Sequence, residues 1–393
     1  MKVLLVSSRH PVPPWRGNQV RTLQWLHALE ADDLTLACPA AERPGTDPPG
    51  CRVVGWRVRD GAVASGVVRA VAAGRPFQEG IYAVPAAVRT VRGLLADERW
   101  DVVIVQMVRC GWVVDEVARL ASPPAVLFDA VDSMALHFRR AAEHSTIGRA
   151  WLERLESARC GVREARLAAA ADAVSAVCRR DLDVVGGATE RHVVVPVAAD
   201  GPADAPGLSA DPMVALTGNL GYRPTRSAIR WFAAHVWPRV RRSVPQARWV
   251  IAGARPPSDV RGLANHSGVE VWADVPDVAR VLSSARVAVA PMDSGSGIPM
   301  KVIEAWAAGV PVIATPRAVE SLEGGVHACE LRRREDVQGW ADAIVELLTE
   351  QTRAHDLARK GRRAWSDTYA PAPVADAVRQ AVASAIAWHG RAP

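Results

Sequence analysis

The chain has 393 residues, of which 49% are hydrophobic and 23% are charged. This composition excludes a disordered chain, and the length predicts two domains, because one core seldom grows beyond about 250–300 residues. The six cysteines are widely spaced without a CxxC pair, which excludes a zinc-ribbon pattern and a disulfide framework.

The chain is basic, with a formal net charge of +6, and only three of its 48 basic residues are lysines. Such a charge favours anionic partners such as nucleotide phosphates or an anionic membrane surface. The sequence shows no nucleic-acid recognition module, so we expect no nucleic-acid partner. With no signal peptide and no apolar run of about 18 residues, we expect a cytoplasmic protein, and peripheral contact with the inner face of a membrane stays open.

A buried-strand pattern at residues 2–7 is followed by a proline-rich loop, Gly17 and an amphipathic helix. Strand, glycine turn and helix open a Rossmann-like unit, in which ligands bind at the carboxyl end of the strand. The loop has no G-x-G-x-x-G, which argues against an ordinary dinucleotide dehydrogenase. Alternating strands and helices continue to about residue 195 and predict a parallel sheet with helices on both faces.

Two aspartates lie near the expected end of the strand at residues 125–128. Asp129 and Asp132 follow this strand, where open α/β sheets place their ligands, and Ser133 comes next. They are candidate catalytic residues. The alternative is that Asp132 and Ser133 only cap the following helix, since both residue types are preferred caps.

Residues 196–212 are rich in Pro, Gly, Ala and Asp and form the best linker candidate. A second α/β series begins at residue 213. We therefore predict an N-terminal Rossmann-like domain at 1–200, a C-terminal one at 201–370, and a final helical segment at 371–393.

Within the second series, residues 287–315 predict a strand, a glycine loop, a helix and another strand. Gly295 and Gly297 allow a tight loop with exposed backbone N–H groups, Pro299 suits the first helical position, and Gly309 ends the helix. A helix start beside such a loop favours a phosphate.

Lys301 and Glu304 stand three residues apart on this helix. The ammonium can neutralise a phosphate, and the carboxylate can accept hydrogen bonds from both hydroxyls of a ribose. The pair therefore indicates a site for a nucleotide diphosphate. The alternative is an exposed helical ion pair that contributes only about 0.2–0.5 kcal/mol.

This stretch resembles the donor-binding motif of retaining GT-B glycosyltransferases of the large family 4 type. The resemblance lies in Gly297, in residues 301–305 (KVIEA) and in residues 308–314 (AGVPVIA). It is nearest to an exopolysaccharide-like subgroup with a glycine-rich loop and a lysine before the ribose-binding glutamate, which matches Glu304. The family's motif has a pair of glutamates, of which Glu304 matches the second, and the sequence departs from it at the first, where Ser296 stands eight residues before Glu304.

The resemblance implies an α/β fold with two Rossmann-like domains whose parallel sheets face a central cleft, and a last helix that packs back on the first domain. It also implies roles for residues of both domains. Donor-sugar contacts come from the loop at residues 294–298 or from Asp293. The donor-binding candidates are Gly17, Asn18, Asn219, Arg223 (or Arg226), Gly253, Arg255, Val275, Asp293, Ser294, Gly295, Ser296, Gly297, Ile298, Lys301 and Glu304.

The expected reaction moves a hexosyl or N-acetylhexosaminyl unit from a nucleotide diphosphate sugar, with UDP favoured, to a hydroxyl of a saccharide, lipid-linked or natural-product acceptor. We expect no metal and no cofactor, because amides, the helix start and Lys301 would stabilise the leaving diphosphate. Asp132, Asp129 and Lys301 are the candidate catalytic residues.

Two alternatives remain open. A sugar-nucleotide 2-epimerase on the same scaffold needs acid and base side chains in the cleft, and Asp129, Asp132 and His137 could serve. A non-catalytic sugar-binding protein would bind the same ligands without turnover.

Overall fold

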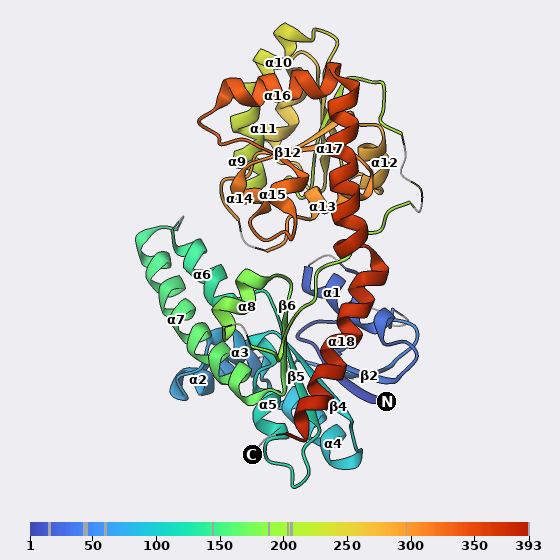
Figure 1. The fold of residues 1–393 in the computed structure, drawn as a ribbon. Coiled ribbons are helices and arrows are strands. Elements are labelled where there is room, and N and C mark those ends of the chain that lie inside the picture. Colours follow the sequence, from blue (N-terminus) through green and yellow to red (C-terminus); the bar gives the residue numbers. More distant parts are fainter. Residues whose placement is uncertain are drawn as a thin grey trace. The chain divides into compact units, whose positions relative to one another are not determined.

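The computed structural model describes residues 1–14, 17–41, 46–58, 61–143, 145–187, 189–202, 204, 207–295 and 297–391. The chain divides into two compact units, Met1–Val197 with Val374–Pro393, and Ala198–Pro373. Each unit contains one all-parallel sheet with helices packed against it (Figure 1). The predicted α/β class with two Rossmann-like domains is confirmed. The predicted boundaries were 200/201 and 370/371, each three residues from the observed divisions.

The first unit has, within the described residues, a seven-stranded sheet in the order β3-β2-β1-β4-β5-β6-β7. Its strands are β1 (Lys2–Val6), β2 (Asp33–Pro39), β3 (Arg52–Trp56), β4 (Val102–Gln106), β5 (Ala125–Val131), β6 (Ala173–Ala176) and β7 (His192–Val194). Its helices are α1 (Gly17–Ala28), α2 (Ala62–Ala72), α3 (Phe77–Tyr82), α4 (Pro85–Asp97), α5 (Trp112–Val117), α6 (Met134–Ala142), α7 (Ile147–Ala170), α8 (Arg179–Val185) and α18 (Pro371–His389), with a 3-10 turn at Val108–Cys110.

The second unit has, in the part of the chain that is described, a six-stranded sheet in the order β10-β9-β8-β11-β12-β13. Its strands are β8 (Met213–Thr217), β9 (Arg248–Gly253), β10 (Val269–Ala273), β11 (Val287–Ala290), β12 (Val312–Ala314) and β13 (Glu330–Leu331). Its α-helices are α9 (Arg223–Trp231), α10 (Trp237–Ser243), α11 (Ser258–Arg261), α12 (Val278–Ser283), α13 (Met300–Ala307), α14 (Pro316–Val319), α15 (Gly325–Ala328), α16 (Val337–Thr349) and α17 (Gln351–Ala364). Alternate strand residues supply two hydrophobic clusters, one on each face of this sheet.

The helix expected after the first strand of this unit is not uniform. A π-helical turn at Phe232–Val236 separates α9 from α10 and comes just before Pro238. Proline has no N–H for the preceding turn, and its ring crowds the carbonyl four residues back, so the backbone widens there. A second π-helical turn, Trp365–Tyr369, likewise precedes Pro371.

The final helix α18 packs on the sheet of the first unit. Val378, Val382 and Ala385 are buried in one hydrophobic cluster with residues of α1, β1, β2 and β4. Near its end, the His389 ring lies 3.2 Å from an Asp172 carboxylate oxygen. The last segment of the chain thus completes the core of the unit that contains the first.

A fully buried ion pair joins α1 to the centre of the same sheet. Nε of Arg21 donates to both carboxylate oxygens of Asp129, at 3.1 and 2.9 Å, and neither side chain is exposed. Gln106 on β4 and Ser175 on β6 also donate to this carboxylate, at 3.2 and 2.9 Å. Another nitrogen of Arg21 donates to the Val195 carbonyl after β7. One carboxylate therefore ties four elements together.

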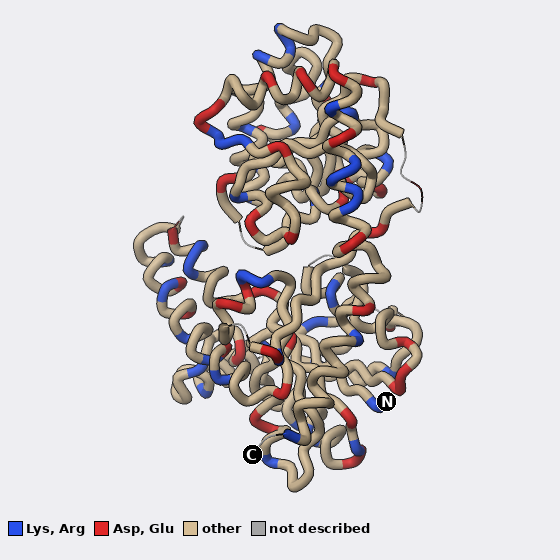
Figure 2. The backbone as a smooth tube through the Cα atoms, in the orientation of Figure 1, with Lys and Arg blue, Asp and Glu red and all other residues tan. Residues whose placement is uncertain are grey.

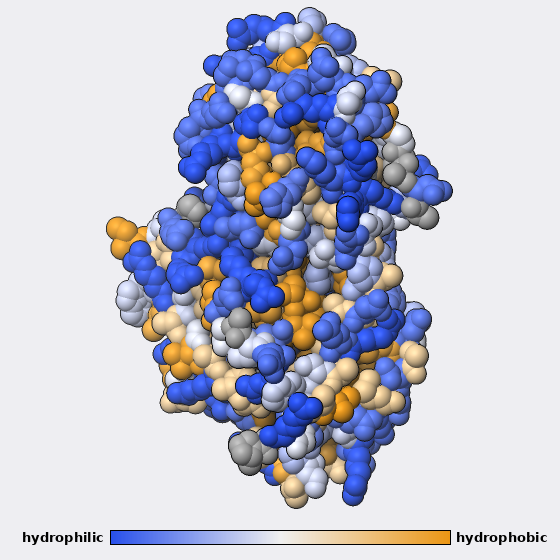
Figure 3. Space-filling view, in the orientation of Figure 1, coloured by the Kyte–Doolittle hydropathy of each residue, from blue (hydrophilic) through white to orange (hydrophobic). Residues whose placement is uncertain are grey.

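Charged residues are distributed over both units, with both signs interspersed (Figure 2). The face in Figure 3 is mainly hydrophilic, with separate smaller hydrophobic areas. Among the described helices, none combines the length and apolar character that a membrane crossing requires.

We expect Arg21→Leu to lower the free energy of unfolding by about 3–5 kcal/mol, because it leaves the Asp129 carboxylate buried without its cation. Arg379→Leu is the matched control, since Arg379 forms an exposed pair with Asp376 and should change stability by about 0.5 kcal/mol or less. Urea unfolding of both variants measures the difference. Equal small effects would contradict a structural role for the buried pair.

Candidate active site

Helix α13 follows the loop after β11 and begins at Met300. Pro299, expected at the first helical position, instead lies at the N-cap, with φ −79° and ψ 79°. Gly309 follows the helix in the left-handed region, at φ +70°, and its N–H donates to the Trp306 carbonyl. The helix thus ends at the predicted glycine, which tolerates this conformation because it has no Cβ.

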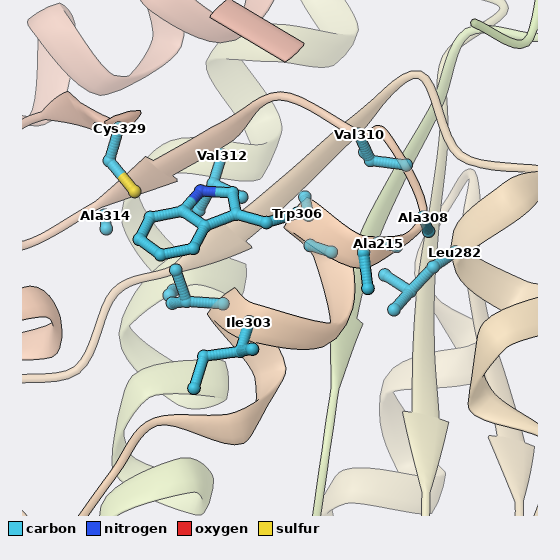
Figure 4. Close-up of a cluster of buried hydrophobic side chains, with 14 of the residues drawn as sticks. Ala215, Leu282, Ile303, Trp306, Ala308, Val310, Val312, Ala314 and Cys329 are labelled. Atoms are coloured by element: carbon cyan, nitrogen blue, oxygen red, sulfur yellow. The ribbon is translucent and has the colours of Figure 1, made fainter. Parts of the chain in front are cut away.

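Trp306 anchors α13 in the core. It is fully buried among Ile303, Val312, Ala314 and Cys329 (Figure 4). Helix α17 contributes Gly361 to the same contact, where a Cβ would lie 2.4 Å from the indole ring. Because so much apolar surface is packed on this side, the helix has little freedom to rotate, and its side chains opposite this core have defined positions.

Lys301 and Glu304 both lie partly buried on α13. Burial lowers the pKa of the Lys301 ammonium, and the Glu304 carboxylate opposes that shift. Burial likewise raises the pKa of Glu304, and Lys301 opposes it. Neither side chain has a hydrogen bond or a salt bridge to any described residue. They are therefore not the exposed helical ion pair of the alternative interpretation, and each keeps its polar atoms available to a ligand.

Two glycines lie at neighbouring strand ends, and one of them, Gly218, is next to the Lys301 side chain. A Cβ on Gly218 would lie 3.4 Å from Cε and 3.5 Å from Nζ of Lys301. Gly253, at the end of β9, has φ +152°, and a Cβ there would lie 1.7 Å from the Gly218 carbonyl oxygen. Close backbone approach at the carboxyl ends of β8 and β9 therefore requires glycine at Gly253.

A cavity of about 360 Å³ lies against the start of α13. Its lining brings together seven of the predicted residues: Asn219, Ser294, Gly295, Gly297, Ile298, Lys301 and Glu304. A second cavity of about 520 Å³ shares Met300 and Glu304 with the first and extends to Pro276 and Asp277. Cavities of this size suit a small ligand, and Glu304 borders both of them.

Other predicted donor-binding residues lie outside these linings. Arg223 is exposed, and Arg226 pairs with Asp259, with a 2.7 Å hydrogen bond to its carboxylate. Asp293 forms a salt bridge with Arg334, which also packs over the Trp231 ring at 5.0 Å. The Arg226 guanidinium is therefore bound to a carboxylate in this structure, instead of being available to a diphosphate.

The remaining predicted residues of this unit are near the second cavity or at strand ends. Val275 packs against the hydrophobic core and directly precedes Pro276. The Arg255 backbone N–H donates to the Asp274 carboxylate at 2.8 Å, and both residues have positive φ. Ser296 lies outside the described residues.

The lining residues of the first cavity that sequence analysis missed include Tyr222, Arg317 and Ser321. Arg317 belongs to α14, which follows β12 directly, and its buried Nε has no hydrogen-bond partner among the described residues. The signal that could have found it is its position just past a strand end, on the edge where ligands bind in open α/β sheets.

In the first unit, the prediction that Asp129 faces a ligand needs correction. β5 extends to Val131, three residues beyond its expected end, so Asp129 lies within the strand. Its side chain is fully buried and bonded to Arg21, Gln106 and Ser175. The structure therefore gives Asp129 a structural position with no surface for a substrate.

Asp132 does lie just past the end of β5. Burial raises the pKa of its carboxyl, the Asp181 carboxylate raises it further, and His137 and Arg109 oppose the shift. The cap of α6 is Ser133, whose hydroxyl accepts from the Leu136 N–H at 3.2 Å. The capping alternative thus holds for Ser133 and not for Asp132.

The backbone around Asp132 is strained. Val131 has φ +63°, and Met107, just past the end of the neighbouring strand β4, also has φ +63°. Positive φ is costly for a β-branched residue, and such outliers concentrate at functional sites. The strain favours a functional role for the edge of the sheet that carries Asp132.

Gly17 and Asn18 open α1 at the carboxyl end of β1. Gly17 is exposed, and the Asn18 carbonyl accepts a hydrogen bond from the Thr22 hydroxyl at 2.9 Å. The Asn18 side-chain nitrogen is buried without a partner among the described residues. Contact of these residues with a donor phosphate or an acceptor stays a prediction.

The two Rossmann-like units define the GT-B fold, and solved structures of that fold resemble nearly the whole chain. Sucrose-phosphate synthase from Thermosynechococcus elongatus is 18% identical, with 96% of this chain and 97% of that chain covered and a TM-score of 0.66. HepE from Anabaena, in complex with UDP and glucose, is 13% identical, with 98% of this chain and 100% of that chain covered and a TM-score of 0.64. Trehalose-6-phosphate synthase OtsA is 10% identical, with 98% of this chain and 99% of that chain covered and a TM-score of 0.62.

Residues 211–350 match the protein-family model described as glycosyl transferases group 1. This range includes α13, whose residues Met300, Lys301 and Glu304 line the cavities. No curated protein matches the chain by sequence. The family model thus matches part of the second unit, and the solved structures match the fold of nearly the whole chain.

Glu164, a buried carboxyl group near Asp132, leads to a prediction on how stability depends on pH. Burial raises the pKa of Glu164, whose carboxylate accepts from the Ser133 hydroxyl, to about 7 from an ordinary value of 4.5. The pKa of Glu164 is higher in the folded protein than in the unfolded chain. The free energy of unfolding therefore falls by about 3 kcal/mol as the pH rises from about 4.5 to about 7. Glu164→Gln should remove that part of the pH dependence.

The measurement is urea unfolding of the wild type and the variant between pH 4.5 and pH 8. Glu30→Gln, a substitution at an exposed position two residues after α1, is the control and should keep the wild-type profile. Parallel profiles for the wild type and Glu164→Gln would show that this carboxyl does not titrate in the expected range.

Proposed function

We propose that this protein is a retaining glycosyltransferase that moves a hexosyl or N-acetylhexosaminyl unit from a UDP-linked sugar to a hydroxyl acceptor in glycan or natural-product biosynthesis. One observation carries the proposal. Lys301 and Glu304 are partly buried beside a glycine loop, line one cavity and have no partner among the described residues. Desolvated groups held without partners are typical of binding sites.

The donor fits this arrangement by charge. The leaving diphosphate gains negative charge as the glycosidic bond breaks, and Lys301 with the loop amides near Gly297 is placed to stabilise it. Glu304 borders both cavities, so a ribose bonded to its carboxylate would have phosphates on the Lys301 side and a base toward Pro276. The complex of HepE with UDP supports UDP as the nucleotide.

The acceptor side of the proposal rests on Asp132. A carboxyl with a raised pKa at a strained strand end is suited to take the proton from an acceptor hydroxyl. Retention follows if that hydroxyl attacks from the side of the leaving diphosphate, which needs no covalent nucleophile. The synthases among the similar structures make a saccharide the preferred acceptor class. The proposal needs neither a metal ion nor a cofactor.

Incubation with single UDP-sugars in the absence of acceptor tests the reaction class. We expect slow release of UDP by hydrolysis, faster when a saccharide acceptor is added, because water can occupy the place of the acceptor hydroxyl. Chromatography of the nucleotides and sugars measures it. Appearance of the 2-epimer would support the epimerase instead, and binding without any conversion would support a sugar-binding protein.

Site variants test the division of work between the residues. Glu304→Ala and Lys301→Ala should weaken nucleotide-sugar binding about tenfold or more, since each removes a charged partner worth roughly 1.5–3 kcal/mol. Asp132→Asn should instead lower kcat at least about a hundredfold with little change in nucleotide affinity. Calorimetry gives the dissociation constants, and steady-state kinetics gives kcat.

Glu335→Ala, which removes an exposed carboxylate outside both cavities, is the matched control and should behave as the wild type. Unchanged nucleotide affinity in Glu304→Ala would make Glu304 an ordinary helix residue. Equal losses of nucleotide affinity in Lys301→Ala and Asp132→Asn would contradict separate roles for the two residues.

A further inference from the structure

A separate cavity of about 440 Å³ lies in the first unit and is lined by residues of α2, α3, α4 and α5. None of the residues discussed above as candidates for transfer lines it. Its volume falls in the range of sites for small ligands.

Glycines fix the two helices that form one wall of this cavity. A Cβ on Gly66 of α2 would lie 2.2 Å from the Gly80 carbonyl oxygen of α3, and a Cβ on Gly80 would lie 2.8 Å from the Gly66 carbonyl oxygen. Both glycines are buried. The helices therefore touch backbone to backbone, which makes this wall a packed part of the fold.

The charged residues of the lining carry a surplus of positive charge. They are Arg69, Arg75, Arg89, Arg92, Glu79 and Glu116. The two carboxylates are already bonded to guanidinium groups, Glu79 to Arg163 and Arg75, and Glu116 to Arg92 and Arg119. Arg69 and Arg89 thus face the cavity without a carboxylate partner among the described residues.

Three donors in this lining lack a good acceptor. Arg89 has no hydrogen bond or ion pair to any described residue, and Arg69 has one long contact, 3.4 Å, to the Ala83 carbonyl. Trp112 is 4% exposed, and its indole N–H is buried without a partner in the described part of the chain. The Trp112 indole N–H is the buried donor of the three, whereas Arg69 and Arg89 are exposed and lie on two other helices, α2 and α4.

We propose that this cavity binds the phosphate group of a small phosphorylated ligand, held by the guanidinium groups of Arg69 and Arg89, with the Trp112 side chain as part of the wall beside them. A phosphate supplies several acceptor oxygens together with negative charge, which matches a lining with spare donors and spare positive charge. The volume leaves room for an organic group of roughly sugar size beside the phosphate.

The phosphate can come from a soluble metabolite or from a lipid headgroup. Helix α2 exposes Val63, Val68 and Val71, at 36, 67 and 40%, on the same helix that carries Arg69. Exposed apolar side chains next to cationic ones occur on surfaces that touch anionic membranes. The experiment therefore needs one arm for each source.

The test follows the indole N–H signal of Trp112 by ¹H–¹⁵N NMR, assigned by its loss in Trp112→Phe. The probes are inorganic phosphate, a hexose 6-phosphate, and phosphatidylcholine vesicles with and without phosphatidic acid. The signal reports this cavity alone, so phosphate that binds near Lys301 does not interfere. We expect the signal to shift as phosphate is added. Arg89→Gln should raise the phosphate concentration at the midpoint of this shift about tenfold or more, and each tenfold corresponds to about 1.4 kcal/mol.

Arg242→Gln, an exposed arginine substitution on α10 of the second unit, is the matched control for lost charge and should leave the midpoint unchanged. A response to the hexose 6-phosphate that exceeds the response to vesicles supports a soluble ligand. A response only to phosphatidic acid vesicles supports the headgroup. The proposal is overturned if no probe moves the signal, or if Arg89→Gln and Arg242→Gln shift the midpoint equally.

Discussion

The packing of Trp306 is the constraint on which the candidate site depends. Its indole is fully buried between β12 and α17, and Gly361 allows α17 to touch the ring. With that side of α13 held, Lys301 and Glu304 stay partly buried where no described residue satisfies them. Burying charged groups that form no hydrogen bond or salt bridge costs free energy, and the packing of the core on the other side of α13 offsets this cost.

In the first unit, by contrast, a buried charged side chain on β5 has hydrogen-bond and ion-pair partners. Asp129 is as deeply buried as any residue of the sheet, yet Arg21, Gln106 and Ser175 saturate its oxygens. Three residues later, Asp132 follows a strained backbone position, with the Asp181 carboxylate as well as His137 and Arg109 near its carboxyl group. The same strand therefore carries one aspartate that holds the fold together and one that remains chemically available.

Sequence patterns predicted the alternating elements, the glycine loop, Lys301 and Glu304, because those features repeat local rules of periodicity and chain conformation. They misplaced Asp129, because a strand's last residues depend on pairing with distant strands, here β4 and β6. They also assigned Asp293 and Arg226 to the donor, although Arg334 and Asp259 bind these side chains. Long-range ion pairs of this kind have no local signature, and the same holds for the arginines around Trp112.

The structure gives a reason for one of the three lysines in this arginine-rich chain. The Lys301 ammonium lies over Gly218, where the distances to an added Cβ would be 3.4 and 3.5 Å, and Gly218 in turn packs on Gly253. A lysine places a compact ammonium at this point, whereas an arginine would place a wider planar guanidinium there. Burial lowers the pKa of the Lys301 ammonium, and the nearby Glu304 carboxylate opposes this shift.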